Sequence, residues 1–247
     1  MEEIITKKKV IETIGFELET TLKPYRFKFV KTKDSLIRKH KDGFDKILFY
    51  ATSGYPYSHQ ELGVQFMVRL NDVENVVGKF YDDRFRNMEY AKDYYSIGVD
   101  YRELKEKNDI SFEVKGSSSC NLCKRIDRDI EFIIHNEDDL KRLSIYLGNF
   151  IESKALDFFE KSKDIAWLND HYKNLLLNSE HPIDLFSVMN SLVLMKLCND
   201  PKVSKLSKDY TKSMVPAIGF EHSSYEALDE IKQYLGITTN MVNPNRG

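Results

Sequence analysis

The sequence predicts an α+β protein, in which an N-terminal helix and a twisted antiparallel sheet are followed by a C-terminal helical bundle. In several segments between residues 25 and 134, apolar residues recur at every second position, a period typical of half-buried strands. From residue 136 onward they recur at every third or fourth position, as in amphipathic helices. Because the strands precede the helices instead of alternating with them, a parallel sheet is not expected. We therefore predict a helix-plus-sheet region over 1–135, a helical region over 136–237 packed with it as one unit, and a frayed tail over 238–247.

The first helix is predicted over residues 4–22. Spacings of three and four place a set of apolar side chains on one face of it. They are Val10, Ile11, Ile14, Leu18 and Leu22. Pro24 ends the helix, because the residue before a proline avoids the helical region.

The period of two predicts the strands of the sheet. The segments are residues 25–30, 36–40, 44–50, 62–70, 96–101, 110–115 and 130–134. Asp42-Gly43 separates the second and third of these, and we expect both residues at positive φ in the centre of a tight hairpin turn.

Helices are predicted between and after the strands, and three polar or glycine residues mark their ends. Asn71 begins a short helix, and Asn136 caps a longer one with acidic residues in its first turn. The later helices are expected near residues 164–177, 185–198, 202–214 and 223–235. The helix at 185–198 is apolar on nearly every side, so we place it at the centre of the bundle. Gly236 is expected to end the last helix.

Composition and charge narrow the class of protein. Hydrophobic residues make up 41% of the chain and charged residues 31%, which is typical of a globular protein. A formal net charge of -2 does not favour a dedicated nucleic-acid binder, because phosphate contacts usually require a basic protein. The charged first residues and the lack of an 18-residue apolar run predict a soluble, cytoplasmic protein with no membrane segment. Three cysteines, an odd and sparse number, favour reduced thiols.

Several short segments resemble a bacterial domain family of unknown function, the one numbered four thousand three hundred and four. They are the opening helix with Leu22-Lys23-Pro24-Tyr25-Arg26-Phe27-Lys28, a basic strand reaching Arg38, the Asp42-Gly43 turn, and Phe158-Phe159-Glu160-Lys161 followed by Asp164 and Leu168. The family typically has a glycine where this chain has Arg26. The resemblance covers about residues 7–175 and implies the α+β fold. It implies no activity, and residues 180–247 would be a helical extension.

Cys120 and Cys123 form a C-x-x-C pair in a polar segment. Two thiolates at this spacing can bind zinc or form a redox pair. A structural zinc needs four ligands, however, and Cys198 belongs to an apolar helix. We therefore predict no tightly bound metal and keep a small metal or redox protein as an alternative.

A second motif consists of Asp100, Glu113 and Lys115. Metal-dependent nucleases of the PD-(D/E)xK type place an acid on one strand and an acid-x-lysine on the next. Their carboxylates hold magnesium and the lysine helps to orient or activate water. Alternation places Glu113 and Lys115 on the same side of a strand, and Glu17 or Glu19 could add an acid. A solvated strand face with an ion pair explains the same residues.

The third segment, residues 80–101, is rich in aromatic side chains interleaved with arginine. Tyrosine and arginine are enriched at the energetic centres of protein interfaces. The candidate binding residues are Arg84, Arg86, Tyr90, Tyr94 and Tyr95. Rings that simply cover the sheet are the competing interpretation.

No phosphate-binding loop, zinc-protease motif or nucleophile elbow is present in the sequence. We therefore expect a non-enzymatic interaction factor without a cofactor, of a toxin-neutralising or defence-associated kind, that binds a protein partner. The alternatives are the magnesium-dependent nuclease and the small metal or redox protein.

Overall fold

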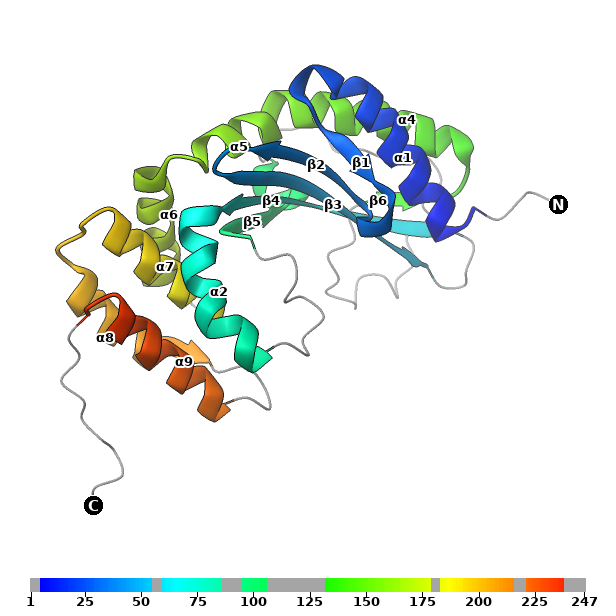
Figure 1. Ribbon diagram of the computed structural model, residues 1–247. Helices are drawn as coiled ribbons and strands as arrows, with labels where there is room; N and C mark the ends of the chain where they lie inside the picture. Colours follow the sequence, from blue (N-terminus) through cyan, green and yellow to red (C-terminus); the bar gives the residue numbers. More distant parts are fainter. Residues whose placement is uncertain are drawn as a thin grey trace. The chain divides into compact units, whose positions relative to one another are not determined.

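The computed structural model describes residues 5–54, 59–85, 95–105, 132–178, 183–215 and 221–237, and it confirms the α+β fold (Figure 1). The chain forms two compact units. The sheet unit contains Met1–Val68 and Ile97–Glu160, and the helical unit contains Arg69–Ser96 and Lys161–Gly247. This division differs from the boundary that the change of period places after residue 135. The reason is that the helical residues 137–160 belong to the sheet unit, whereas α2 (Asn71–Phe85), which lies between two strands in the sequence, belongs to the helical unit.

The sheet unit begins with α1 (Lys7–Thr21), whose N-terminus is capped by Thr6. The Thr6 hydroxyl accepts a hydrogen bond from the Lys9 backbone N–H at 3.2 Å, as an N-cap residue should. The predicted apolar stripe is buried and lies against β1, β2 and β3. At Gly15 a Cβ would come within 2.3 Å of the Phe29 ring, so the absent side chain allows the helix to approach the sheet closely.

Six strands form one sheet in the order β1-β2-β3-β4-β5, and β6 pairs with β4. Their bounds are β1 Lys28–Val30, β2 Ser35–His40, β3 Gly43–Ser53, β4 Gln60–Leu70, β5 Ile97–Asp100 and β6 Phe132–Ile134. The pairs β1–β2, β2–β3, β4–β5 and β4–β6 are antiparallel. Two short 3-10 turns, Lys23–Tyr25 and Lys31–Lys33, flank β1. The sequence prediction began the first strand at residue 25, which is too early, because Arg26 has a φ of 65° and interrupts the extended chain.

The hairpin between β2 and β3 is present, but its turn lies one residue earlier than expected. His40 pairs with Gly43, so Lys41 and Asp42 occupy the centre of the turn. Neither has a positive φ, whereas Gly43 has a φ of 153°. The expected turn, with positive φ at Asp42 and Gly43, was therefore wrong: the glycine begins the strand in a conformation that other residues rarely adopt.

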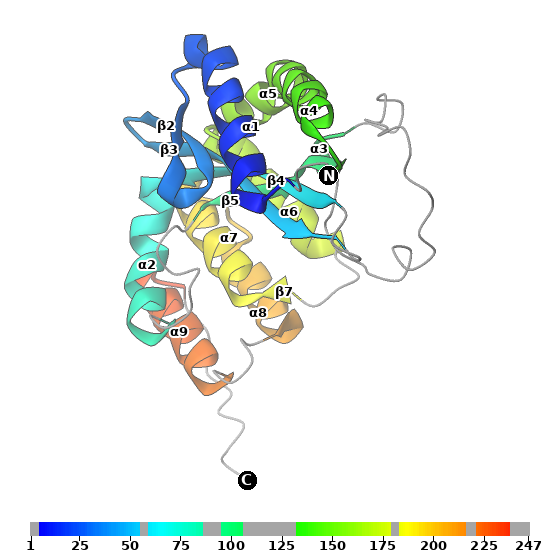
Figure 2. The ribbon, with the colours of Figure 1, turned by 90° about the vertical axis from the view of Figure 1, so that its right-hand side faces the viewer.

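Helix α4 (Glu137–Phe150) begins at the predicted cap and lies beside α1 (Figures 1 and 2). Asn136 accepts a hydrogen bond from the Asp139 backbone N–H at 2.9 Å. A single π-helical turn, Ile151–Ala155, leads into α5 (Leu156–Lys161). Phe150 and Phe159 from these helices pack against Phe66 of β4, so they complete the core of the sheet unit. The short α3 (Tyr101–Leu104) follows β5 directly.

The helical unit is arranged around α7 (Leu185–Leu197). The other helices are α2, α6 (Ile165–Asn178), α8 (Val203–Ser213) and α9 (Glu221–Tyr234), and α7 contacts all four of them. This confirms the central position predicted from its apolar sequence. Two short strands, β7 (Ile183–Asp184) before α7 and β8 (Met214–Val215) after α8, pair in parallel. Gly236 has a φ of 64° at the end of α9, as expected for a helix stop.

Among the residues that the structure describes, no helix combines the length and the apolar character needed to cross a membrane.

Candidate functional site

Asp100, the first residue of the nuclease hypothesis, has a local structural role. It ends β5 opposite Gln65 of β4 and precedes α3. Its backbone N–H donates a hydrogen bond to Glu103 Oε1 at 2.8 Å, which is how a capping residue fixes the start of a helix. Glu113 and Lys115 lie outside the described residues, so the magnesium site that they would complete stays a prediction.

Of the five candidate binding residues in the aromatic segment, Tyr95 is the one whose side chain the structure describes. It is half-buried, with its ring edge-on to that of Phe186 on α7 at 6.2 Å. The next residue, Ser96, is buried and donates a hydrogen bond to Glu74 Oε1 at 2.8 Å. Arg84 lies within α2, but its side chain is outside the description, as are Arg86, Tyr90 and Tyr94 altogether. Tyr95 therefore packs on its own chain, and the binding role of the segment stays a prediction.

The C-x-x-C pair, Cys120 and Cys123, also lies outside the described residues. Cys198, at the end of α7, is a free thiol that donates a weak hydrogen bond to the Ile165 carbonyl at 3.5 Å. Burial raises the pKa of this thiol, so it is not an activated nucleophile. Within the described segments, no three His, Cys, Asp or Glu side chains gather to hold a metal ion.

A groove that the sequence analysis did not predict lies in the helical unit between α6 and α8. Its volume is about 580 Å³. Each helix contributes four residues, which are Asp170, Lys173, Asn174 and Leu177 from α6, and Lys202, Lys205, Leu206 and Asp209 from α8 and its cap. In both sets the spacing is i, i+3, i+4, i+7, so each helix presents one continuous face to the groove.

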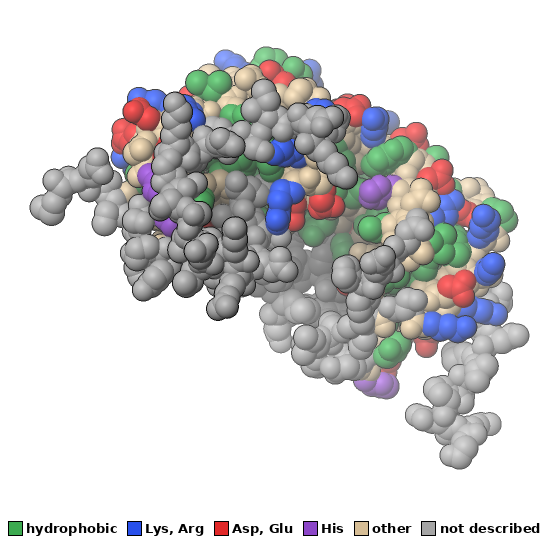
Figure 3. Space-filling model, turned by 180° about the vertical axis from the view of Figure 1, so that it is seen from behind, with side chains coloured by type: hydrophobic (Ala, Val, Ile, Leu, Met, Phe, Trp, Pro, Cys, Tyr) green, Lys and Arg blue, Asp and Glu red, His purple; other side chains and the backbone are tan. Residues whose placement is uncertain are grey.

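The groove combines an apolar floor with a charged rim. Leu206 is buried at 5% exposure, whereas Leu177 is 57% exposed and open to a ligand. On the side of α6 away from the groove, Leu176 is buried, whereas its neighbour Leu175 is 51% exposed. In Figure 3, hydrophobic and cationic side chains lie next to each other on the surface of the helical unit, at the right of the view.

The turn between α7 and α8 positions the charges of the groove. Asn199 ends α7 in a left-handed conformation, with a φ of 53° that asparagine tolerates better than most residues. Pro201 prevents the helix from continuing. Asp200 then accepts a hydrogen bond from the Lys202 backbone N–H at 2.9 Å and so begins α8.

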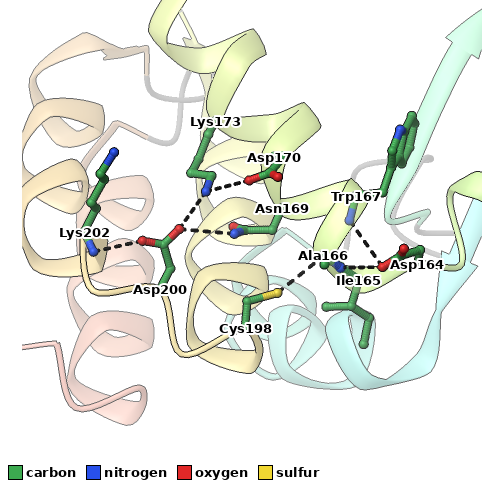
Figure 4. Close-up of polar contacts among 10 residues, drawn as sticks. All are labelled: Asp164, Ile165, Ala166, Trp167, Asn169, Asp170, Lys173, Cys198, Asp200 and Lys202. Atoms are coloured by element: carbon green, nitrogen blue, oxygen red, sulfur yellow. Dashed lines mark hydrogen bonds and ion pairs between the residues drawn. The ribbon is translucent and has the colours of Figure 1, made fainter.

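Asp200 is also the centre of a polar cluster (Figure 4). Its Oδ2 accepts hydrogen bonds from Lys173 Nζ at 2.7 Å and from Asn169 Nδ2 at 3.2 Å. Burial opposes ionisation of Asp200, but the hydrogen bonds from Lys173, Lys202 and Asn169 outweigh it, so the pKa of its carboxyl lies below the ordinary value.

Lys173 bridges two carboxylates. Its ammonium contacts Asp170 Oδ1 and Asp200 Oδ2, both at 2.7 Å. Hydrogen bonds with Asp170 and Asp200 raise the pKa of Lys173 above its ordinary value. The ammonium is therefore protonated at neutral pH and held in place, and it fixes one wall of the groove.

The other wall is cationic. Lys202 and Lys205 are exposed, and the outward side of α8 continues with Lys208 and Lys212. Asp209 is the one acidic residue of α8. Such a face attracts an anionic ligand, and the apolar floor favours one that also carries a hydrophobic side chain.

The sheet unit contains a second charged cluster, which is centred on Arg38 and packs against aromatic rings. Arg38 Nε contacts Asp45 Oδ2 at 2.7 Å, and its Nη2 contacts Glu160 Oε1 at 2.8 Å. The guanidinium lies over the rings of Phe27 and Phe159, with its Cζ 5.0 and 5.7 Å from their centroids. Because the Asp45 side chain is fully buried and that of Arg38 is 14% exposed, this pair belongs to the core, whereas Glu160 is 61% exposed and lies at its surface.

Comparison of the chain with protein-family models, with curated proteins and with solved structures gives no match. The resemblance to the bacterial domain family therefore stays a prediction that rests on the short motifs. The residues that line the groove are therefore the basis for a functional proposal.

The sequence does contain a signal for the groove. Positions 170, 173, 174 and 177 and positions 202, 205, 206 and 209 each combine three polar residues with one leucine at the spacing i, i+3, i+4, i+7. The apolar residues of these helices predict their buried sides, and the groove residues occupy the remaining, polar side of each helix. Nothing in either helix alone indicates that these two faces lie opposite each other.

Proposed function

We propose that this protein is a non-enzymatic interaction factor, which binds an acidic, amphipathic helical segment of a partner protein in the groove between α6 and α8. One observation carries the proposal. Two helices present matching i, i+3, i+4, i+7 faces that enclose an apolar floor and a cationic wall. An apolar groove that receives one face of an amphipathic helix is a recurrent mode of peptide recognition.

The chemistry of the floor favours a hydrophobic anchor. Leu177 is exposed and Leu206 lines the same groove, so an aromatic or aliphatic side chain of the partner would bury apolar surface of its own and that of Leu177. Burial of apolar surface contributes about 25 cal/mol per Å². A few such anchors usually supply most of the affinity of an interface.

The chemistry of the walls favours acidic neighbours of that anchor. Lys202 and Lys205 are exposed beside Leu206, whereas Lys173 is held by Asp170 and Asp200. Carboxylates one helical turn apart on a partner would meet the two exposed ammonium groups. Pairs of this kind at a solvent-accessible rim chiefly determine partner choice and association rate.

The groove offers poor chemistry for catalysis. Its eight lining residues include no hydroxyl, thiol or imidazole. The amine of Lys173 would need a lowered pKa to act as a nucleophile, but the two carboxylates shift it in the opposite direction. These properties support binding over reaction at this site.

The test uses a panel of fluorescent helical peptides that carry one aromatic anchor flanked by glutamates. We expect fluorescence anisotropy to show binding to the wild-type chain. Lys202→Glu with Lys205→Glu should weaken it at least tenfold, since the exposed cations become anions. Lys196→Glu is the matched control, because it reverses an exposed charge outside the groove lining.

Two results would contradict the proposal. One is equal affinity for the double variant and for the Lys196→Glu control. The other is tighter binding to a DNA or RNA oligonucleotide than to every acidic peptide, because α8 would then be recognising phosphates.

A further inference from the structure

The chain itself carries a helix with the chemistry that the groove favours. On α9, exposed residues at helical spacing form an outward face, which contains His222, Tyr225, Glu226, Asp229 and Glu230. Tyr225 is 42% exposed, and the Glu226 and Asp229 side chains are 48% and 57% exposed. One aromatic side chain with acidic neighbours is therefore displayed on a folded helix.

Helix α9 is held firmly by its other face. Ala227, Leu228 and Ile231 are fully buried, and the helix contacts α2 and α7. Its outward face is thus presented without any need for the helix to fold on binding, which removes an entropic cost that a disordered segment would carry.

The groove of the same chain is out of reach of this face. Lys232 of α9 donates a hydrogen bond to Thr211 Oγ1 of α8 at 2.7 Å. Thr211 lies two residues beyond Asp209, or about 200° around the helix axis at 3.6 residues per turn. Helix α9 therefore contacts α8 on the side opposite to the groove, so a docked α9 has to come from another molecule.

We infer that the occupant of the α6–α8 groove is α9 of a second copy of this chain, with Tyr225 on the floor formed by Leu177 and Leu206. Glu226 and Glu230, one turn apart, face the exposed ammonium groups of Lys202 and Lys205. This inference rests on the proposed binding role of the groove and names its partner. Because the groove and the α9 face are different surfaces of the same helical unit, the contact is head-to-tail, and each copy can offer one surface to one neighbour and the other surface to the next.

The experiment is a charge exchange measured by sedimentation velocity over a range of protein concentrations. The groove variant carries Lys202→Glu and Lys205→Glu, and the helix variant carries Glu226→Lys and Glu230→Lys. We expect the wild type to self-associate with increasing concentration and each variant alone to associate at least tenfold more weakly. Mixing the two variants should restore association, since every groove then meets a helix of opposite charge.

All four substitutions are at exposed positions, and circular dichroism verifies that each variant is folded. A wild type that stays monomeric at high concentration would overturn the inference, as would variants that associate as well as the wild type or a mixture that does not associate. A monomer that still binds the acidic peptides would refute self-association and leave the proposed function standing. Assemblies that obey the charge exchange without binding any foreign peptide would support self-association and refute the broader binding role.

Discussion

The sheet unit and the helical unit each contain an ion pair with the same contact distance, yet the two pairs have different surroundings. Arg38 and Asp45 meet at 2.7 Å across neighbouring strands, and Lys173 and Asp200 meet at 2.7 Å between neighbouring segments of the helical unit. The first pair is covered by the rings of Phe27 and Phe159. In the second pair Lys173 lines an open groove, and Asp200 behind it is 8% exposed.

The difference shows that the contact distance alone does not reveal what an ion pair does. A buried pair has lost its hydration, so removal of one partner leaves a buried charge with weaker compensation, and for Asp45 the His40 imidazole lies 3.6 Å away. A pair that reaches solvent on one side is partly screened and contributes less to stability, and here the Lys173 side chain is 20% exposed and that of Asp200 8%. Its main effect is to hold side chains in place, and here it fixes Lys173 and the start of α8. The same contact thus supports the core in one unit and shapes a surface in the other.

The largest effect is expected in the sheet unit. Arg38→Leu removes the guanidinium from the buried Asp45 carboxylate, and it should lower the free energy of unfolding by about 3–5 kcal/mol. Urea denaturation measures this loss. Arg38→Leu combined with Asp45→Leu should recover most of it, because no uncompensated charge remains. A loss below about 1 kcal/mol in the single variant would show that the cluster is hydrated and would end the contrast between the two pairs.

An intermediate effect, dependent on pH, is expected for Asp200. Asp200→Asn keeps the shape of the side chain and removes the charge that Lys173 contacts, so at pH 7 it should cost about 1.5–3 kcal/mol. The pKa of Asp200 is lowered in the folded state, which means that its contribution is present above the unfolded pKa of about 3.9 and is lost as the pH falls through the folded pKa. The difference in stability between the wild type and the variant should therefore shrink below about pH 4.

Urea titrations between pH 7 and pH 3 test this dependence. Asp209→Asn serves as the control, because this exposed rim residue should change stability by less than about 0.5 kcal/mol at either pH. A difference between wild type and Asp200→Asn that stays constant as the pH falls would assign the effect to packing instead of charge.

The smallest effect on stability is expected for the residues that matter most for binding. Lys202→Glu with Lys205→Glu should change the free energy of unfolding by no more than about 0.5 kcal/mol, since both side chains are exposed. The same variant is expected to lose peptide binding and self-association. Urea unfolding measures the stability of this variant, and fluorescence anisotropy of the same preparation measures its peptide binding. A large loss of stability would indicate that these lysines support the fold, as Arg38 does.

Much of the fold follows from local sequence. The Asn136 cap and the Gly236 stop lie where the chemistry of helix ends places them, and the apolar sequence of α7 predicted its central position correctly. The β2–β3 hairpin was predicted too, but the conformation of its turn was not. An Asp-Gly pair indicates that the hairpin needs a glycine. It does not indicate whether that glycine lies in the turn or at the first position of the next strand.

By itself, the sequence determined most of the longer helices and strands among the described residues, and which face of most of them is buried. Those properties depend on hydrophobic period and on capping groups only a few residues apart. The tertiary structure alone decided where the charged residues of different segments meet. Lys173 and Asp200 are brought together by the turn after α7 and by the packing of α6 and α8 on that helix. Arg38 and Glu160 meet because α5 returns to the sheet. The sequence does not reveal such pairings of polar side chains, since an exposed lysine and a lysine that completes a site can occupy equivalent positions in the pattern of a helix.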